Sequence, residues 1–235
     1  MIDRHLPLIR SLKQHLETLS GLGITELPCP TGPAPADPMP SAVLAPPATQ
    51  PNKTERLAHV AQEAERCRRC PLHTSRTHMV FSDGTADAQL VFVGEAPGHD
   101  EDLQGIPFVG AAGQLLTRMI EAIGLKREQV YICNVLKDRP PGNRTPLPEE
   151  MEACLPFLQE QLAVVQPKVI CALGATAARA LLGPGAAITR VRGTLHDYHG
   201  TPVVPTFHPA YLLRNPDAKK QAWADLKLVR SLLDS

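Results

Sequence analysis

Four short runs of apolar residues recur along the last two thirds of the chain, and stretches with helical periodicity lie between them. The apolar runs are Gln89–Val93, Val130–Val135, Val169–Ala172 and Val203–Pro205. Short continuous runs of this kind are typical of strands that are buried on both faces. The helical stretches are Gly113–Ile123, Pro148–Val165, Thr176–Leu182 and Lys219–Leu233. Strands that alternate with helices predict an α/β fold, with three layers (α/β/α) around a central, mostly parallel sheet of four strands.

The first 52 residues follow a different pattern. Between Ile2 and Leu19 apolar residues recur every three or four positions, which predicts an amphipathic helix docked on the domain or on a protein partner. Residues 28–52 are rich in Pro, Ala and Thr, a composition typical of an extended linker. We therefore expect an N-terminal extension (1–27), a Pro-rich linker (28–52) and a globular domain (53–235). A helix over Thr54–Glu65 opens this domain, with Thr54 as its cap.

Composition narrows the setting in which the domain works. The 235 residues include 24 Lys and Arg against 24 Asp and Glu, so a nucleic-acid partner would need local basic patches. The six cysteines are too few and too irregular for a disulfide scaffold, and no secretory signal or membrane-length apolar run is recognisable. We expect a monomer in a reducing cytoplasm with no membrane partner, where clustered cysteines indicate metal binding or catalysis.

Gly-rich and polar segments follow the predicted strands, at the edge of a parallel sheet where binding sites collect. The segment Gly94–Gly98 allows a tight turn and the close approach of a ligand to the backbone. Phe108 lies in the Gly-framed segment Gly105–Gly113, which suits a pocket wall, and its ring offers a flat face to a base. Asn134 ends the second strand. Its amide presents one donor and one acceptor in a plane, which matches O4 and N3–H of uracil and mismatches cytosine.

The segment after the last predicted strand combines a histidine, His208, with an apolar tip. Tyr211, Leu212 and Leu213 form this tip, and Arg214 follows it directly. Apolar wedges beside cationic side chains are what proteins use to enter a stack of bases. We therefore expect these four residues to bind DNA.

Cysteines and basic residues cluster in two further segments. Cys67 and Cys70 form a C-x2-C pair, a metal-binding signal because two thiolates on one turn chelate at little added entropic cost, and Cys154 lies far downstream. The basic residues of the two segments are Arg66, Arg68, Arg69, His73, Arg76, His78, Lys137, Arg139 and Arg144. They indicate either an ordinary solvated face or a surface that follows DNA phosphates beside the pocket.

These motifs together resemble the family 4 uracil-DNA glycosylases, the iron–sulfur type of bacteria and archaea. The resemblance runs from about Glu63 to the C-terminus. It rests on Gly94–Gly98, Glu101-Asp102, Gly105–Gly113, Tyr131–Asn134, Arg139–Arg144 and Thr206–Pro216, in that order. It implies an α/β/α fold, a 4Fe–4S cluster, and a base-excision repair activity that flips uracil out of DNA and hydrolyses its N-glycosidic bond.

By position, the resemblance implies that Phe108 stacks on the flipped uracil and that Asn134 reads its edge. Glu95 and Ala96 would form the wall at the strand end, with Glu95 in a catalytic role. Glu101 would narrow the pocket against the methyl group of thymine. Ala96 stands where the family 1 enzymes carry a catalytic Asp, so activation of water by a dedicated carboxylate is not expected there.

The expected chemistry therefore centres on the leaving group. Cleavage of the C–N bond can proceed through an oxocarbenium-like sugar and a uracil anion, so that stabilising the anion matters most. We assign His208 to donate a hydrogen bond to the O2 side of the leaving uracil. Arg144 is expected to contact the DNA.

One position departs from the family pattern. The family usually reads Lys-Cys-Arg-Pro-Pro, and this Cys is the third cluster ligand, sixteen residues before the fourth. Here Asp138 takes its place, sixteen residues before Cys154. The expected ligands are therefore Cys67, Cys70, Asp138 and Cys154, although a carboxylate holds iron less firmly than a thiolate. Ligation by Cys133 and a labile or three-iron cluster remain open.

Other functions fit part of the pattern. A weakly active or non-catalytic DNA-binding relative is favoured by the missing thiolate and opposed by the intact pocket residues. A nucleotide hydrolase or transferase would use the Gly-rich turn for phosphate, but neither a P-loop ending nor a GxGxxG motif follows it. At the metal site, zinc held by Cys67, Cys70, Cys154 and a histidine is the alternative to iron.

Overall fold

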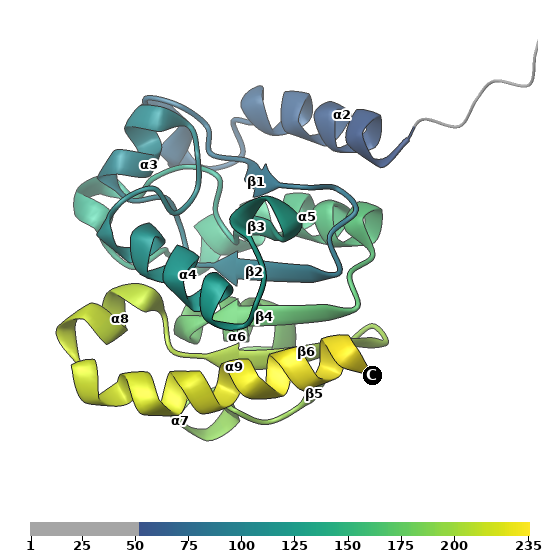
Figure 1. The fold of residues 1–235 in the computed structure, drawn as a ribbon. Helices are drawn as coiled ribbons and strands as arrows, with labels where there is room; N and C mark the ends of the chain where they lie inside the picture. Colours follow the sequence, from purple (N-terminus) through teal and green to yellow (C-terminus); the bar gives the residue numbers. More distant parts are fainter. Residues whose placement is uncertain (1–51) are drawn as a thin grey trace, which may run out of the picture. The chain divides into compact units, whose positions relative to one another are not determined.

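The four apolar runs form the four central strands of one sheet in the computed structural model, which describes residues 52–235 (Figure 1). The strands are Leu90–Gly94 (β2), Tyr131–Asn134 (β3), Val169–Leu173 (β4) and Thr201–Thr206 (β6). They lie in the order β3-β2-β4-β6, and all three neighbouring pairs are parallel. The predicted helix over Ile2–Leu19 and Cys29 lie outside the described residues.

Two short edge strands extend the sheet to six strands within residues 52–235, so the prediction of four strands is corrected. Ser82–Gly84 (β1) pairs antiparallel with β3, and His196–Tyr198 (β5) pairs antiparallel with β6. The full order is β1-β3-β2-β4-β6-β5. Each edge strand has three residues, none of them fully buried, so neither produces the apolar run by which the central strands are recognised.

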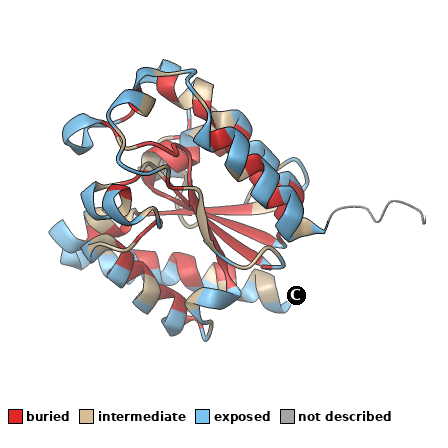
Figure 2. Cartoon of the chain, turned by 90° about the horizontal axis from the view of Figure 1, so that it is seen from above, coloured by how far each residue is buried: buried red, intermediate tan, exposed pale blue. Residues whose placement is uncertain are grey.

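Helices cover both faces of the sheet, which confirms the predicted α/β/α layers. One layer comprises Lys53–Glu65 (α2), Pro148–Val165 (α5) and Gly174–Leu182 (α6). The other comprises Ala111–Ala122 (α4), Pro209–Arg214 (α8) and Lys219–Asp234 (α9). Successive strand residues point to opposite faces, so Val91 packs toward the first layer and Phe92 toward the second. Figure 2 shows the buried sheet between helices whose outer sides are exposed.

Helix α2 begins one residue earlier than predicted, and Asn52 is its cap instead of Thr54. The Asn52 side chain accepts a hydrogen bond from the Glu55 backbone N–H at 2.9 Å, and the Glu55 carboxylate accepts one from the Asn52 N–H at 2.9 Å. This reciprocal capping box satisfies two backbone donors that a helix start leaves free. Thr54 is therefore an ordinary residue of the first turn.

The carboxyl ends of the four parallel strands meet at one edge of the sheet. Gly94 of β2 pairs with Asn134 of β3, and Leu173 of β4 pairs with Thr206 of β6. The short helices His99–Gln104 (α3) and α8 lie at this edge, on the left of Figure 1. The segments that follow the strands are thereby brought together. No helix in the described part of the chain is long and apolar enough to span a membrane.

Candidate active site

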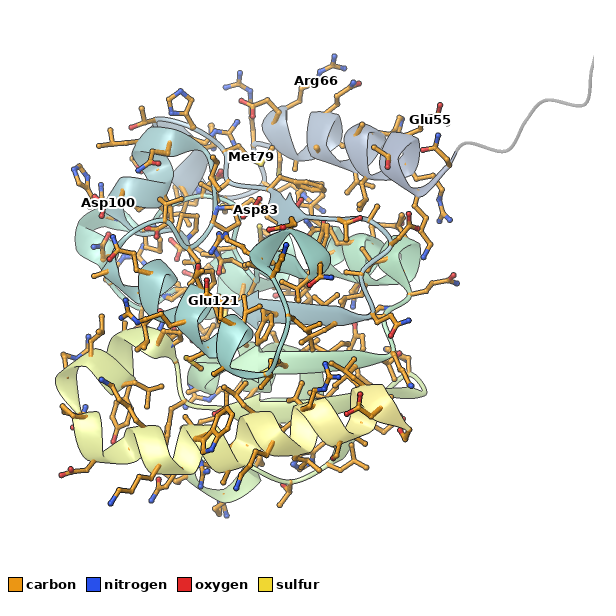
Figure 3. All side chains as sticks on the ribbon, in the orientation of Figure 1. Glu55, Arg66, Met79, Asp83, Asp100 and Glu121 are labelled. Carbon is orange, nitrogen blue, oxygen red and sulfur yellow. The ribbon has the colours of Figure 1, made fainter. Side chains whose placement is uncertain are left out.

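A pocket of about 600 Å³ opens at the carboxyl edge of the sheet. Its lining comes from residues 95–101 after β2, from Phe108 and the start of α4, from Asn134 at the end of β3, from the loop 140–145, and from α8 with the residue before it. Asp100, which Figure 3 labels on α3, is one of the residues that line it. Glu95, Ala96, Glu101, Phe108, Asn134 and His208 all line this pocket. Segments that are far apart in the sequence thus converge as the sheet topology predicts.

The pocket has an unpaired polar atom at its base. Asn134 is 2% exposed, and its Oδ1 is buried without a hydrogen-bond partner among the described residues. Gly94 leaves room for this amide, because a Cβ on Gly94 would lie 2.3 Å from Asn134 Oδ1 and 2.5 Å from Phe108 Cζ. A buried acceptor without a partner is costly unless a ligand completes it. The Asn134 amide therefore indicates a ligand that brings a donor.

The Phe108 ring forms the neighbouring wall and is held there by an unusual backbone. Phe108 is 6% exposed and has a φ of 55°, which a bulky residue rarely adopts. Gly113 permits this conformation, since a Cβ there would lie 1.8 Å from the Phe108 carbonyl oxygen. Arg127 Nη2 also donates to the Pro107 carbonyl oxygen at 2.6 Å. Strain of this kind is retained where the surrounding contacts over-determine it, which is typical of functional sites.

Glu101 is engaged with the backbone of this same segment. Its Oε1 accepts hydrogen bonds from the N–H groups of Val109 and Gly110, each at 3.0 Å, and its Oε2 accepts one from Gly98 N–H at 3.1 Å. The carboxylate therefore ties the start of α3 to the segment after Phe108. A barrier to the thymine methyl group by Glu101 stays a prediction, while the structure assigns it this supporting role.

His208 has one defined neutral tautomer. It caps α8, and its Nδ1 accepts the Ala210 backbone N–H at 3.1 Å, while Pro209 occupies the first helical position. Because Nδ1 accepts, the ring proton resides on Nε2. Burial, together with the positive charge of Arg214, lowers the pKa of His208 to about 4. At neutral pH His208 is therefore an uncharged donor beside the Phe108 ring, with the ring centroids 5.6 Å apart.

Glu95 is the carboxylate that follows β2 directly, and Ala96 is the half-buried residue beside it. The hydroxyl of Thr176, at the start of α6, donates a hydrogen bond to Glu95 Oε2. The backbone carbonyl of Glu95 accepts the Leu136 N–H at 3.0 Å, which fixes the turn against the end of β3. Ala96 has no group that can activate water. The acidic residue nearest to it in the sequence is its neighbour Glu95.

Helix α8 presents a mixed apolar and cationic surface beside the pocket. Tyr211 is 39% and Leu213 41% exposed, and Arg214 is exposed next to them. Leu212 departs from the predicted arrangement: it is 1% exposed and packs in the core between α4 and α9. A helix of this length buries one side, so consecutive residues cannot all face outward. Leu212 is therefore a core residue that anchors α8, and its side chain is unavailable to DNA in this structure.

The expected basic surface is smaller than the sequence indicated. Arg144 forms a bidentate pair with the fully buried carboxylate of Glu150, at 2.9 and 2.6 Å. Lys137 is 2% exposed, and its Nζ donates to Asn134 O and Gln161 Oε1, both at 2.6 Å. Lys137 therefore belongs neither to a solvated face nor to a phosphate-binding surface, the two alternatives that the sequence left open. Arg66, which Figure 3 labels at the end of α2, does remain exposed.

Comparison with known proteins decides the family. A model described as the uracil DNA glycosylase superfamily matches residues 81–227, which include every pocket residue described above. The chain belongs to this superfamily. A type-4 uracil-DNA glycosylase of Thermotoga maritima is 51% identical over 165 residues, which cover 69% of this chain and 86% of the relative. Its counterpart in Archaeoglobus fulgidus is 44% identical over 186 residues, covering 76% and 94%. The resemblance inferred from the motifs is confirmed.

A type-5 uracil-DNA glycosylase of Pyrobaculum aerophilum is more distant. It is 32% identical over 146 residues, which cover 55% of this chain and 64% of the relative. Cys67 and Cys70 precede the segment that the superfamily model matches. The cysteine pair lies outside the matched segment, so its environment has to be judged from this chain's own contacts.

The residues predicted as cluster ligands converge in the structure of this superfamily member. Cys67 and Cys70 pack against the core group that contains Cys154. The pKa of the Cys70 thiol is raised mainly by burial and also by the charges of Asp138 and Cys67. Burial raises the pKa of Cys154 to about 11, and the charges of Asp138 and Cys70 add to this. Cys70 is therefore within electrostatic reach of Cys67, Asp138 and Cys154, and Cys154 is within reach of Asp138.

Two of the thiols accept hydrogen bonds from nitrogen. The Lys137 backbone N–H donates to Cys154 Sγ at 3.2 Å, and Arg69 Nε donates to Cys67 Sγ at 3.4 Å. Bonds of this kind tune the sulfur ligands of iron–sulfur clusters. Within residues 52–235 no three His, Cys, Asp or Glu side chains surround a single-ion position. A preassembled zinc site is therefore not found there, while a cluster with several irons has more widely spaced ligands.

Asp138 and Cys133 occupy different surroundings. Asp138 is 7% exposed, and its Oδ1 accepts a hydrogen bond from Arg76 Nη1 at 2.8 Å. Burial raises the pKa of this carboxyl, against the opposing effect of Arg76. Cys133 is fully buried within β3, where burial raises its pKa to about 11 and the charge of Lys137 opposes this. The charge of Asp138, and not that of Cys133, thus acts on the thiols of Cys70 and Cys154.

Sequence analysis missed two residues that support the pocket from β4 and α6. Thr176 is 3% exposed and binds Glu95, and Gly174 lies against His208. A glycine directly after a buried strand was the available signal for Gly174, since it follows the same pattern as Gly94. The hydroxyl of Thr176 gave no such signal, because a Thr near the start of a helix is common.

Proposed function

We propose that this protein is a uracil-DNA glycosylase that removes uracil flipped out of DNA. The observation that carries the proposal is the buried, unpaired Oδ1 of Asn134 at the base of the pocket. An amide at this position pairs with O4 and N3–H of uracil, whereas cytosine offers the reverse pattern. A site with a buried unpaired acceptor rejects bases that leave it unpaired. The type-4 glycosylases to which the chain is similar carry uracil-DNA in their names.

The bond broken is the N-glycosidic bond between C1′ of the deoxyribose and N1 of uracil. Its electron pair leaves with uracil, so negative charge develops on the base. A water oxygen then bonds to C1′, a proton is released, and an abasic site remains. Stabilising the departing anion lowers the barrier most where the donor is already in place.

His208 supplies this donor. Its Nε2–H is free to donate because Nδ1 is occupied by the Ala210 N–H. The lowered pKa keeps the imidazole ring neutral at neutral pH, so His208 donates this hydrogen bond as an uncharged group. In the proposed reaction His208 stabilises O2 of the leaving uracil.

Phe108 and Glu95 act on the two other parts of the substrate. The Phe108 ring stacks on the face of the flipped base, next to the Asn134 amide. The Glu95 carboxylate supplies negative charge that stabilises the cationic sugar. Ala96 has no carboxylate, so of the neighbours Glu95 and Ala96 only Glu95 can supply this charge.

The exposed side of α8 is suited to holding the DNA open. Tyr211 and Leu213 enter the base stack in place of the flipped nucleotide, and Arg214 pairs with a phosphate. Arg144 already pairs with Glu150, so we expect it to order the loop 140–145 more than to attract phosphate. The two arginines thus have different expected roles, because Arg144 is paired with a carboxylate of this chain and Arg214 is exposed.

A 4Fe–4S cluster fits the group formed by Cys67, Cys70 and Cys154, with Asp138 at the fourth position. Once the three thiols lose their protons to bind iron, they and the carboxylate would supply four anionic ligands, and backbone and side-chain N–H groups support two of the sulfurs. When bound, the cluster would be structural and join the segment around Cys67 to the loop after β3. The proposed hydrolysis requires no electron transfer and uses the residues of the pocket.

The test is single-turnover release of uracil from a labelled oligonucleotide by iron-replete protein. Asn134→Ala removes the reading amide, and Gln62→Ala on the exposed side of α2 truncates an amide outside the pocket lining. Release by the wild type and by Gln62→Ala, with a loss of about 100-fold or more in Asn134→Ala, supports the proposal. No release by the wild type, with DNA binding retained, would favour the non-catalytic DNA-binding relative.

A further inference from the structure

The two side chains assigned to catalysis follow β2 and β6, and β4 lies between these strands. The corner at which β4 turns into α6 therefore sits between Glu95 and His208. It begins with Gly174 at the first position of α6 and includes Thr176 two residues later. None of these corner residues lines the pocket itself.

We propose that Thr176 is a positioning residue for Glu95, within a β4–α6 corner that supports both catalytic side chains. The inference rests on the proposed glycosylase function and adds to it residues outside the pocket lining. Its main observation is the hydrogen bond that the Thr176 hydroxyl donates to Glu95 Oε2.

The burial of Thr176 keeps water from competing for this hydrogen bond. Thr176 is 3% exposed, so water does not replace its hydroxyl as a partner for Glu95. The buried hydroxyl binds one oxygen of the Glu95 carboxylate, and Glu95 itself lines the pocket. Fixing a long, flexible side chain in one orientation before the substrate arrives removes a reorganisation cost from the reaction.

Gly174 supports the second catalytic side chain by lacking a Cβ. Its φ is +89°, and a Cβ there would lie 2.9 Å from the Cβ of His208. A larger residue would be strained in this conformation and would push His208 away. The same turn thus holds Glu95 by a hydrogen bond and His208 by close contact, which fixes their separation.

A double-mutant cycle tests whether Thr176 acts through Glu95. Thr176→Val removes the hydroxyl but keeps the shape, and Thr176→Ser keeps the hydroxyl. Each is combined with Glu95→Ala, and single-turnover rate and half-saturating DNA concentration are measured. We expect Thr176→Val to slow release about 10- to 100-fold in the wild-type background, with DNA binding unchanged. In the Glu95→Ala background it should have less than about a twofold effect.

The outcomes separate the explanations. A rate in Thr176→Ser close to wild type, together with the loss of the Val effect in Glu95→Ala, supports the positioning role. An equal loss in both backgrounds, or no loss in either, overturns it. If Thr176→Val does not fold, Thr176→Ala gives the same comparison with a smaller side chain. Absence of uracil release from the wild type would instead refute the glycosylase function, before any variant is compared.

Discussion

Arg76 Nη1 donates to Asp138 Oδ1 across 2.8 Å, and both side chains are largely buried. The same guanidinium also bonds to the carbonyl oxygen of Glu65 at the end of α2. Arg76 thereby connects the segment around Cys67 with the loop after β3. A cluster bound by Cys67 and Cys70 from the first segment and by Asp138 from the second would make the same connection. Asp138 can therefore pair with Arg76 and also bind the cluster, because Arg76 uses only Oδ1 of its carboxylate.

The first prediction concerns the iron content when a thiolate is restored. Asp138→Cys provides the ligand that family 4 enzymes usually carry, and thiolate holds iron more firmly than carboxylate. We expect more iron and sulfide per chain and a slower bleaching of the cluster in air. Anaerobic purification followed by iron and sulfide quantification and visible spectroscopy measures both.

Asp83→Cys is a matched control, because Asp83 pairs with Arg127 at 2.7 Å as Asp138 pairs with Arg76. It breaks a similar ion pair away from the cysteine group and should leave the iron content unchanged. Equal iron content and spectra in wild type and Asp138→Cys would show that position 138 does not bind the cluster.

The parts of the fold that could be predicted are those in which burial leaves a local pattern. β2, β3, β4 and most of β6 are covered on both faces, so each contains a continuous apolar run. β1 and β5 are short and partly exposed, and pairing with a neighbour defines them. The six residues of α3 are held by the carboxylate of Glu101, a contact that no periodicity records.

The site could be predicted where its residues lie at the end of a strand or shortly after it, as Asn134 and His208 do. The predictions failed where burial depends on packing. Leu212 and Lys137 look like surface residues in sequence, yet neighbouring helices enclose the first and a hydrogen-bond network the second. Thr176 is 81 residues from its partner Glu95, so only the sheet order brings the two together.

The second prediction is the dependence of the reaction on His208 and on pH. His208→Ala removes the donor to O2 and should slow single-turnover release by about 10²–10³. The wild-type ring stays neutral above its pKa of about 4. Protonation of His208 should therefore cause no change in rate between about pH 5 and 8. A wild-type rate with an inflection near pH 6.5 that disappears in His208→Gln would contradict this.

The third prediction concerns stability, because the same pKa links folding to pH. The pKa of His208 is about 4 in the folded protein and near its ordinary value of 6.5 in the unfolded chain. Between these values the unfolded state binds more protons, so stability is lost as the pH falls from about 6.5 to about 4. The contribution is on the order of 3 kcal/mol.

Urea unfolding of wild type and His208→Gln at pH 7 and pH 4.5 isolates this contribution, because the carboxylates titrate in both proteins. The wild type should lose more stability than the variant on acidification. An equal loss in the two proteins would mean that His208 titrates at its ordinary pKa in the folded state.

The last prediction uses Gly94, the position that leaves space for both the Asn134 amide and the Phe108 ring. In Gly94→Ala the added Cβ would lie 2.3 Å from Asn134 Oδ1 and 2.5 Å from Phe108 Cζ, so both side chains have to move. Overpacking of this kind costs about 1–3 kcal/mol of stability. We expect release of uracil to fall by about 100-fold or more, since a displacement near 1 Å has this effect on aligned groups.

Gly185→Ala is the control, because a Cβ on Gly185 meets nothing within 4 Å. Its rate and its melting temperature should match the wild type. Gly94→Ala should keep its fold, as judged by circular dichroism, while its rate falls much further than its loss of stability explains. If Gly94→Ala released uracil at the wild-type rate, the Asn134 amide and the Phe108 ring could not be the groups that hold the base, because neither can keep its place beside an added methyl group.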